Sequence, residues 1–372
     1  MTFNFPTIDP IPLPAPVWLF KILHNLTLTL HFAFLHLLVG GLFLAVLWNA
    51  IGHLRKSPLA ISSSGMVAAR LPIVMTFVIN LGIPPLLFTQ VLYGRAFYTS
   101  SILIGVYWIS VLLFILTTYF ILYYMGGLAE RKKAWWFWGL LASALLLHVA
   151  SVYTTNMTLM LRPEVWPNMY DASVYGTHMP PLDPTQWPRF AVMMAASISL
   201  GALGSALYTG KKALADEVKI FFRFWSGVIS LIALPVLAAL GLWAFQTQPD
   251  FVQDTLQVSP FYQILLYGWL GCLGLSFLAA LALVLQPKSW SFTRGLLTAL
   301  PAFLSVAVYE LIRDGVRDIT LAHKGFDVWA SPVNTNWPIV GLFLGFFIAG
   351  LGVMIWILKV LRLAKPAEEN YA

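Results

Sequence analysis

Charged residues are scarce in this chain, because only 10% of its 372 residues are Asp, Glu, Lys or Arg. Soluble domains carry about 25% charged residues. The hydrophobic fraction is 59% and the mean hydropathy is +0.79. The shortage of charge therefore excludes an ordinary soluble domain and indicates an integral membrane protein. Its formal net charge of +7 is accounted for by loops at a membrane surface and requires no nucleic-acid partner.

Cysteine is almost absent, since Cys272 is the single one in the sequence. One cysteine excludes an internal disulfide, a Cys-x-x-Cys-His haem attachment site and an iron–sulfur cluster. Any redox centre would have to be held by histidine, methionine or carboxylate side chains. The first residues, MTFNFPTIDPIPLPAPVW, also lack a basic segment and contain several prolines. We therefore predict an extended surface arm there and not a cleaved signal peptide.

Apolar runs of about 20 residues, the length that crosses a bilayer, recur along the sequence. They fall near residues 26–51, 71–91, 102–126, 134–157, 190–209, 224–246, 261–286, 292–312 and 338–361. We predict an all-α polytopic membrane protein with nine transmembrane helices. The expected parts are an arm and interfacial entry (1–25), a first four-helix cluster (26–157), an outer loop (158–189), a second four-helix cluster (190–312), an outer loop (313–337), and the ninth helix with a tail (338–372).

Basic residues gather on alternate connecting segments. Those on the first, third, fifth and seventh segments and after the last helix are Arg55, Lys56, Arg70, Arg131, Lys132, Lys133, Lys211, Lys212, Lys219, Arg223, Lys288, Arg294, Lys359, Arg362 and Lys365. By the positive-inside rule these segments face the cytoplasm. The N-terminus is then predicted outside and the C-terminus in the cytoplasm.

Histidines occur within several of the apolar runs, and an imidazole in hydrocarbon must find a partner. His24 lies at the predicted outer entry of the first helix, and His31 about two turns further in. At 1.5 Å per residue, His31 lies about 9 Å and His148 about 13 Å below the outer boundary. His31 and His148 are therefore candidate metal ligands, with His24 as a substitute. The alternative for each, and the favoured one for His24, His36 and His53, is a hydrogen-bonded histidine at a helix interface.

The first helix carries a recognisable pattern. The run HFAFLHLLVG from His31 resembles the first-helix motif of subunit I of the cytochrome bd quinol oxidases, a histidine followed by Phe-x-Phe and, nine residues on, a glycine. In FVINLGIPPLLFTQVLYGRAFY, Asn80, Gly82 and Gly94 fit the family's second helix. The runs DPTQWPRFAVMMAAS and SPFYQILLYG resemble the entries to its fifth and seventh helices. The resemblance implies a nine-helix bundle like subunit I, in a bacterial cytoplasmic membrane, with His31 as a b-type haem ligand.

The same resemblance implies roles for polar residues. Lys21 falls where the family carries a basic residue, and Gln90 takes the place of a glutamate beside the oxygen-reducing haem. Gln90 could hydrogen-bond a quinone carbonyl or an axial ligand. Glu310 lies near the depth of a glutamate that the family supplies to a third haem. The charges of ELIRDGVRD also repeat at helical spacing, which fits an ion-paired helix end.

Several family features are missing from the sequence. Phe190 to Ser197 contains no histidine for the low-spin haem, and its methionine partner falls near Gly268. The quinol-binding loop between the sixth and seventh helices shrinks to QTQPDFVQDTLQVSP. Gln90 cannot ionise or relay a proton as a glutamate can. We therefore expect no oxygen reduction by this chain.

Three functions remain open from the sequence. The first is a membrane electron-transfer subunit that handles quinone or quinol, holds one b-type haem at His31 and passes electrons to an outer-side redox partner such as a cytochrome c. The second is a haem-free scaffold that anchors other respiratory subunits in the bilayer. The third, a transporter, is disfavoured because no internal repeat is visible and charge within the spans is scarce.

Overall fold

The computed structural model describes residues 5–6, 11–210 and 214–363. Within these residues nine helical segments are long and apolar enough to cross a membrane. The prediction of an all-α polytopic membrane protein with nine spans is therefore confirmed for the described part of the chain. The orientation of the termini stays a prediction.

Ten helices form the nine described spans, because α2 and α3 together form one span. They are α1 (Val17–Leu54), α2 (Pro58–Ala68) joined to α3 (Leu71–Leu103), α4 (Gly105–Glu130), α5 (Trp136–Leu159), α7 (Gln186–Ser205), α8 (Asp216–Gln246), α10 (Pro260–Leu285), α11 (Phe292–His323) and α12 (Trp337–Leu363). Shorter connecting helices are η1 (Pro163–Val165), α6 (Trp166–Ala172), η2 (Ala206–Gly210), α9 (Asp250–Val258) and η3 (Val328–Ala330).

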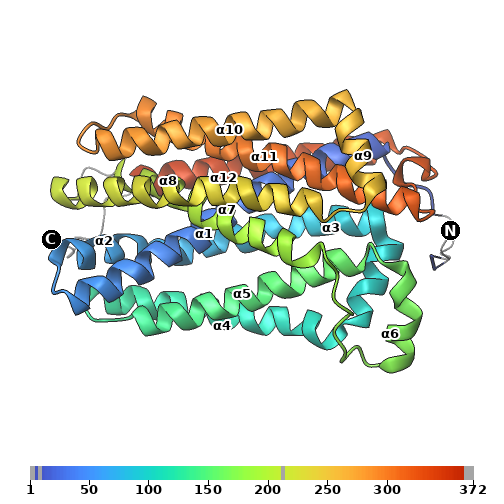
Figure 1. Cartoon of the computed structure of the whole chain (residues 1–372), viewed down its shortest axis with the longest axis horizontal. Coiled ribbons are helices and arrows are strands. Elements are labelled where there is room, and N and C mark those ends of the chain that lie inside the picture. Colours follow the sequence, from blue (N-terminus) through green and yellow to red (C-terminus); the bar gives the residue numbers. More distant parts are fainter. Residues whose placement is uncertain (1–4, 7–10, 211–213, 364–372) are drawn as a thin grey trace.

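The long helices lie side by side along the longest axis of the molecule (Figure 1). The connecting helices α6 and α9 lie at the end where α1 begins, which we call the N-terminal end of the bundle, and α2 lies at the opposite end. The N-terminal end is the one that the basic-residue pattern predicts to face the outside. Residues 313–323, which hydropathy assigns to a connecting segment, continue α11 as helix up to His323.

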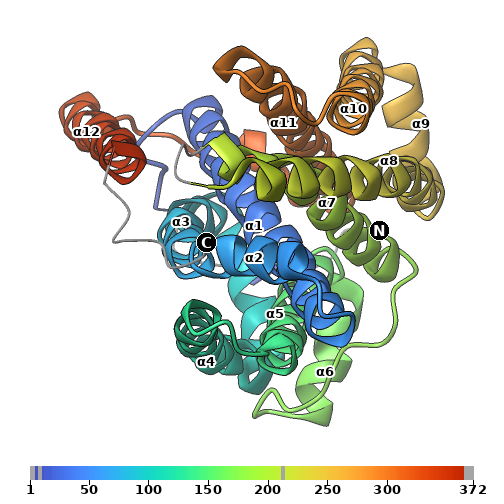
Figure 2. The same ribbon diagram turned by 90° about the vertical axis from the view of Figure 1, so that its left-hand side faces the viewer.

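Helix α1 runs through the middle of the bundle, between a group formed by α3, α4 and α5 and a group formed by α7, α8, α10 and α11 (Figure 2). Its contact with α7 is very close. A Cβ atom on Gly40 would lie 2.7 Å from the Cα of Gly201. Small residues allow two membrane helices to approach to this distance, so the glycines join the two groups of helices.

Helix α3 is kinked at Tyr93. Pro84 and Pro85 lie about two turns before the kink, and each removes one backbone hydrogen bond. Tyr93 has non-helical backbone angles, φ −125° and ψ 22°. The bend directs the buried Tyr93 ring toward α1 and α11, where its hydroxyl meets charged side chains.

Helix α12 stands apart from the other spans (Figure 2). Only 6% of its most apolar 18-residue window is buried, against 61% for the span that begins at Gln186. Its described aromatic contact with the bundle joins Phe343 to Phe88 of α3, with ring centroids 6.2 Å apart. Most of its surface therefore faces lipid or another protein.

Candidate functional site

A group of buried charges lies between α1, α3 and α11 near the N-terminal end of the bundle. The Lys21 Nζ atom lies 2.6 Å from Asp314 Oδ2 and 2.7 Å from Asp318 Oδ2. It also donates a hydrogen bond of 2.7 Å to the Tyr93 hydroxyl. Arg317 completes the group by pairing with Asp314 at 3.4 Å. The two cations and the two carboxylates neutralise each other, which lowers the cost of burying these charges away from water. We call the five residues the charge cluster; they are Lys21, Tyr93, Asp314, Arg317 and Asp318.

The charge cluster also fixes a histidine. His24 Nδ1 lies 3.2 Å from the carbonyl oxygen of Pro85, and its Nε2 lies 3.1 Å from Arg317 Nη1. A carbonyl oxygen accepts and a guanidinium donates, so Nδ1 carries the hydrogen and Nε2 the lone pair. Both nitrogens are thus engaged, and His24 offers no free lone pair to a metal.

A second buried ion pair lies one turn deeper on α11. Glu310 accepts two hydrogen bonds from Arg313 Nη1, of 2.8 and 2.7 Å, and only 1% of the residue is exposed. The Arg313 guanidinium lies over the Phe32 ring, 5.1 Å from its centroid. The charges of ELIRDGVRD therefore form ion pairs within α11, as their helical spacing predicts. Lys21 of α1 adds a partner from a second helix.

Glu310 shares a small cavity with His36. The cavity has a volume of about 10 Å³, the size of one water molecule, and Ser305 and Tyr309 also line it. His36 Nδ1 lies 3.0 Å from Ser197 Oγ, and that hydroxyl donates to the Met193 carbonyl oxygen. Because the hydroxyl has one hydrogen, His36 Nδ1–H is the donor and the lone pair resides on Nε2.

His31 lies between α1 and α3. Its Nδ1 lies 3.0 Å from the carbonyl oxygen of Val78, so Nδ1 donates and Nε2 keeps its lone pair. This is the tautomer that a metal-binding histidine needs. The ring lies directly against α3, because a Cβ on Gly82 would be 2.9 Å from His31 Cε1.

His148, the proposed second ligand, faces a different helix. Its Nε2 lies 3.4 Å from the hydroxyl of Ser110 on α4, and its ring meets Phe114 edge to face at 4.5 Å. Among the described residues, no group of three or more His, Cys, Asp or Glu side chains is arranged to hold a metal ion. His24 has both ring nitrogens in hydrogen bonds and His148 Nε2 lies beside Ser110, so of the three candidates His31 is the one whose Nε2 makes no described hydrogen bond.

The two remaining candidates lie on α3. Asn80 is exposed on the outer surface of the bundle and donates a hydrogen bond of 2.8 Å to the Thr76 carbonyl oxygen. Gln90 is half-buried. The structure therefore brings together Lys21, His24 and, one turn deeper, Glu310, but places Asn80 on a separate face. The sequence did not single out Tyr93 or Ser197, which carry no charge and follow no recognisable spacing.

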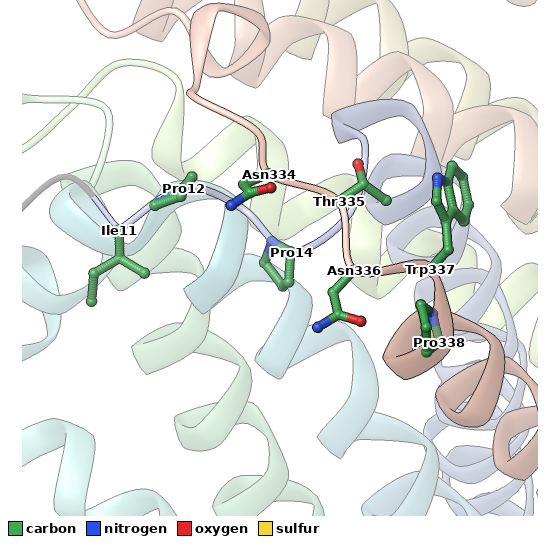
Figure 3. A pocket seen from close by; sticks show the side chains of 8 residues that line it. All are labelled: Ile11, Pro12, Pro14, Asn334, Thr335, Asn336, Trp337 and Pro338. Carbon is green, nitrogen blue, oxygen red and sulfur yellow. The ribbon is translucent and has the colours of Figure 1, made fainter.

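An open groove lies at the N-terminal end of the bundle, beside the arm (Figure 3). Its volume is about 470 Å³, and it lies between Ile11, Pro12 and Pro14 of the arm and residues 334–338. The arm is held there by backbone hydrogen bonds, among them Leu13 N to Pro332 O at 2.7 Å and Asn334 N to Leu13 O at 2.9 Å. The described residues that line the groove carry amide and indole groups and none of them is charged, and none belongs to the charge cluster.

Comparison with known proteins finds a likeness in structure alone. No model of a protein family matches the sequence, and no curated protein sequence is similar to it. The fold is similar to a chain in the structure of bd oxidase from Geobacillus thermodenitrificans, with a TM-score of 0.70 and 12% sequence identity. The match covers 95% of this chain and 99% of that chain. This chain therefore has the fold of a bd oxidase subunit over almost its whole length.

Proposed function

We propose that this chain is a membrane subunit of a respiratory complex that anchors partner subunits and holds no haem of its own. The observation that carries the proposal is the state of the candidate ligands. His24 uses both nitrogens in hydrogen bonds, and His148 contacts α4. The shared fold with a bd oxidase chain supports a respiratory complex. The redox centres would then belong to the partners, which we propose include a membrane subunit and an outer-side electron carrier such as a cytochrome c.

The polar residues support the same function. A family glutamate is replaced by Gln90, which cannot relay a proton. Glu310 is bound by Arg313, and Lys21 by two aspartates. Lys21 joins α1 to α11 through the two aspartates, whereas Glu310 and Arg313 pair within α11, so we propose that these side chains stabilise the bundle and take no part in oxygen reduction.

A second candidate function rests on the tautomer of His31. Its Nε2 lone pair is the donor that a b-type haem would use, and in that case the chain would pass electrons between quinone and an outer-side partner. A haem there would require α3 to move away from the His31 ring, because α3 now packs against it. In this second candidate, Gln90 or Asn80 would hydrogen-bond the quinone.

The two functions differ in haem content, which a pyridine haemochrome assay on the purified full-length chain measures. We expect no haem in the chain and identical visible spectra for the wild type and His31→Ala. His36→Ala is the matched control, since it removes an imidazole from the same helix. A haem signal that His31→Ala abolishes and His36→Ala preserves would replace the anchoring function with the electron-transfer function.

A further inference from the structure

Two hydrogen-bond acceptors line one small cavity in the interior of the bundle. They are the side chains of His36 on α1 and Glu310 on α11, and these residues are only 4% and 1% exposed. The volume of about 10 Å³ is that of one water molecule. The cavity therefore has room for a single small ligand.

The imidazole of His36 contributes a lone pair. Its Nδ1–H donates to Ser197 Oγ at 3.0 Å, because the Ser197 hydroxyl donates its own hydrogen to the Met193 carbonyl oxygen at 2.9 Å. Nε2 of the neutral ring is then an acceptor. None of the described hydrogen bonds ends at this nitrogen. A buried acceptor without a donor costs free energy, so Nε2 requires a donor from the cavity.

The carboxylate of Glu310 is the second acceptor. Arg313 Nη1 donates to both of its oxygens, at 2.8 and 2.7 Å, and this ion pair neutralises the negative charge. A carboxylate can accept about four hydrogen bonds, so lone pairs remain. Two acceptors cannot bond each other directly. His36 and Glu310 therefore need a donor that lies between them.

A water molecule meets this need better than a metal ion does. Water has one O–H donor for each of the two acceptors, and a buried water makes about three hydrogen bonds. The Tyr309 hydroxyl lines the same cavity and can donate the third. Magnesium and calcium take about six or more oxygen ligands. Most side chains that line this cavity are apolar, Val192, Ala196 and Val306 among them.

We propose that one water molecule binds in this cavity, donates hydrogen bonds to His36 Nε2 and to the Glu310 carboxylate, and so joins α1 to α11. The charge cluster joins the same two helices nearer the N-terminal end, through Lys21 and Asp314. The water adds a second connection, one turn deeper on α11. It also gives His36 a partner for proton exchange in a region from which the bilayer excludes water.

Solid-state NMR of the full-length chain in lipid bilayers tests this site. The histidines are labelled with ¹⁵N, and the His36 signals are identified by their loss in His36→Gln. In the wild type at neutral pH, Nε2 is expected to carry no hydrogen and to show the chemical shift of a hydrogen-bond acceptor. Magnetisation is expected to pass from water to this nitrogen.

Two variants fill the cavity from opposite walls. Val306→Ile on α11 and Ala196→Val on α7 each add bulk to a residue that lines it. Both are expected to abolish the transfer from water and to move the Nε2 signal toward that of an unbonded nitrogen. Val236→Ile is the matched control, because Val236 is 50% exposed on α8. It is expected to preserve the wild-type signals.

Four results would overturn the water bridge. The first is a wild-type chain in which no magnetisation passes from water to His36 Nε2, and the second is an unchanged Nε2 signal in both cavity-filling variants. A hydrogen bonded to Nε2 as well as to Nδ1 at neutral pH would show a direct ion pair between His36 and Glu310. A shift of the Nε2 signal when choline replaces sodium in the buffer would assign the cavity to a cation.

Discussion

Replacing Lys21 by methionine is expected to lower the free energy of unfolding by about 3–5 kcal/mol, because it leaves buried carboxylates without their cation. Asp314 keeps Arg317 as a partner, but Asp318 loses its only ion pair among those of the charge cluster. The side chains of Lys21 and Asp318 are 8% and 15% exposed, so water compensates little. Denaturant unfolding in mixed micelles, followed by tryptophan fluorescence, measures the change.

The same substitution at an ion pair with an exposed carboxylate provides the control. Lys219 lies 3.0 Å from Asp216, and their side chains are 14% and 88% exposed, so the carboxylate that loses its cation is in contact with water. Lys219→Met is expected to change the free energy of unfolding by less than about 1 kcal/mol, as for other surface pairs. Adding Asp318→Asn to Lys21→Met should restore part of the lost stability, because it removes the unpaired charge. Equal effects of Lys21→Met and Lys219→Met would show that the charge cluster does not hold α1, α3 and α11 together.

The helical architecture could be predicted from the sequence because its signals are local. Each span is an apolar run of sufficient length, and hydrophobicity over about 20 residues is read without knowing any neighbour. The ends of the helices are harder to predict where charged residues lie within the helix. The predicted arm and entry end at residue 25, whereas α1 begins at Val17; the charged turns of α11 reach His323. Ion pairing across helices keeps both segments helical despite their polar residues.

The candidate site was predictable only in part, because its decisive contacts join distant segments. The run of charges from Glu310 to Asp318 is visible as a pattern, and its pairs within α11 follow from helical spacing. Which imidazole nitrogen is free depends on the carbonyl or hydroxyl of another helix. His31 meets Val78 on α3, and His36 meets Ser197 on α7. No spacing in the sequence contains this information.

The fold likeness and the ligand arrangement point to different properties of the chain. A helical bundle conserves its shape through packing, which many sequences can satisfy, so a bd oxidase chain with 12% identity can share it. Haem binding depends on a few side chains with free nitrogens and enough space. In this chain His24, His31 and His36 form hydrogen bonds to neighbouring helices, so the bundle is held together by contacts that do not themselves require a haem.

The contact between α1 and α7 leads to a further large effect. Gly201→Ala is expected to destabilise the chain by about 1–3 kcal/mol, because the interior offers no space for the added methyl group. A Cβ on Gly201 would lie 2.9 Å from the Cα of Gly40 and still closer to the carbonyl of His36. The helices would have to separate, which would also disturb the His36–Ser197 hydrogen bond.

Gly271→Ala on α10 is the matched control for this substitution. A Cβ on Gly271 would meet nothing within 4 Å. There the methyl group is expected to leave stability unchanged or to raise it by up to about 1 kcal/mol, since alanine favours a helix more than glycine does. Denaturant unfolding of both variants under identical conditions compares them directly. If Gly201→Ala and Gly271→Ala had the same effect, α1 and α7 would not be in the close contact that joins the two groups of helices.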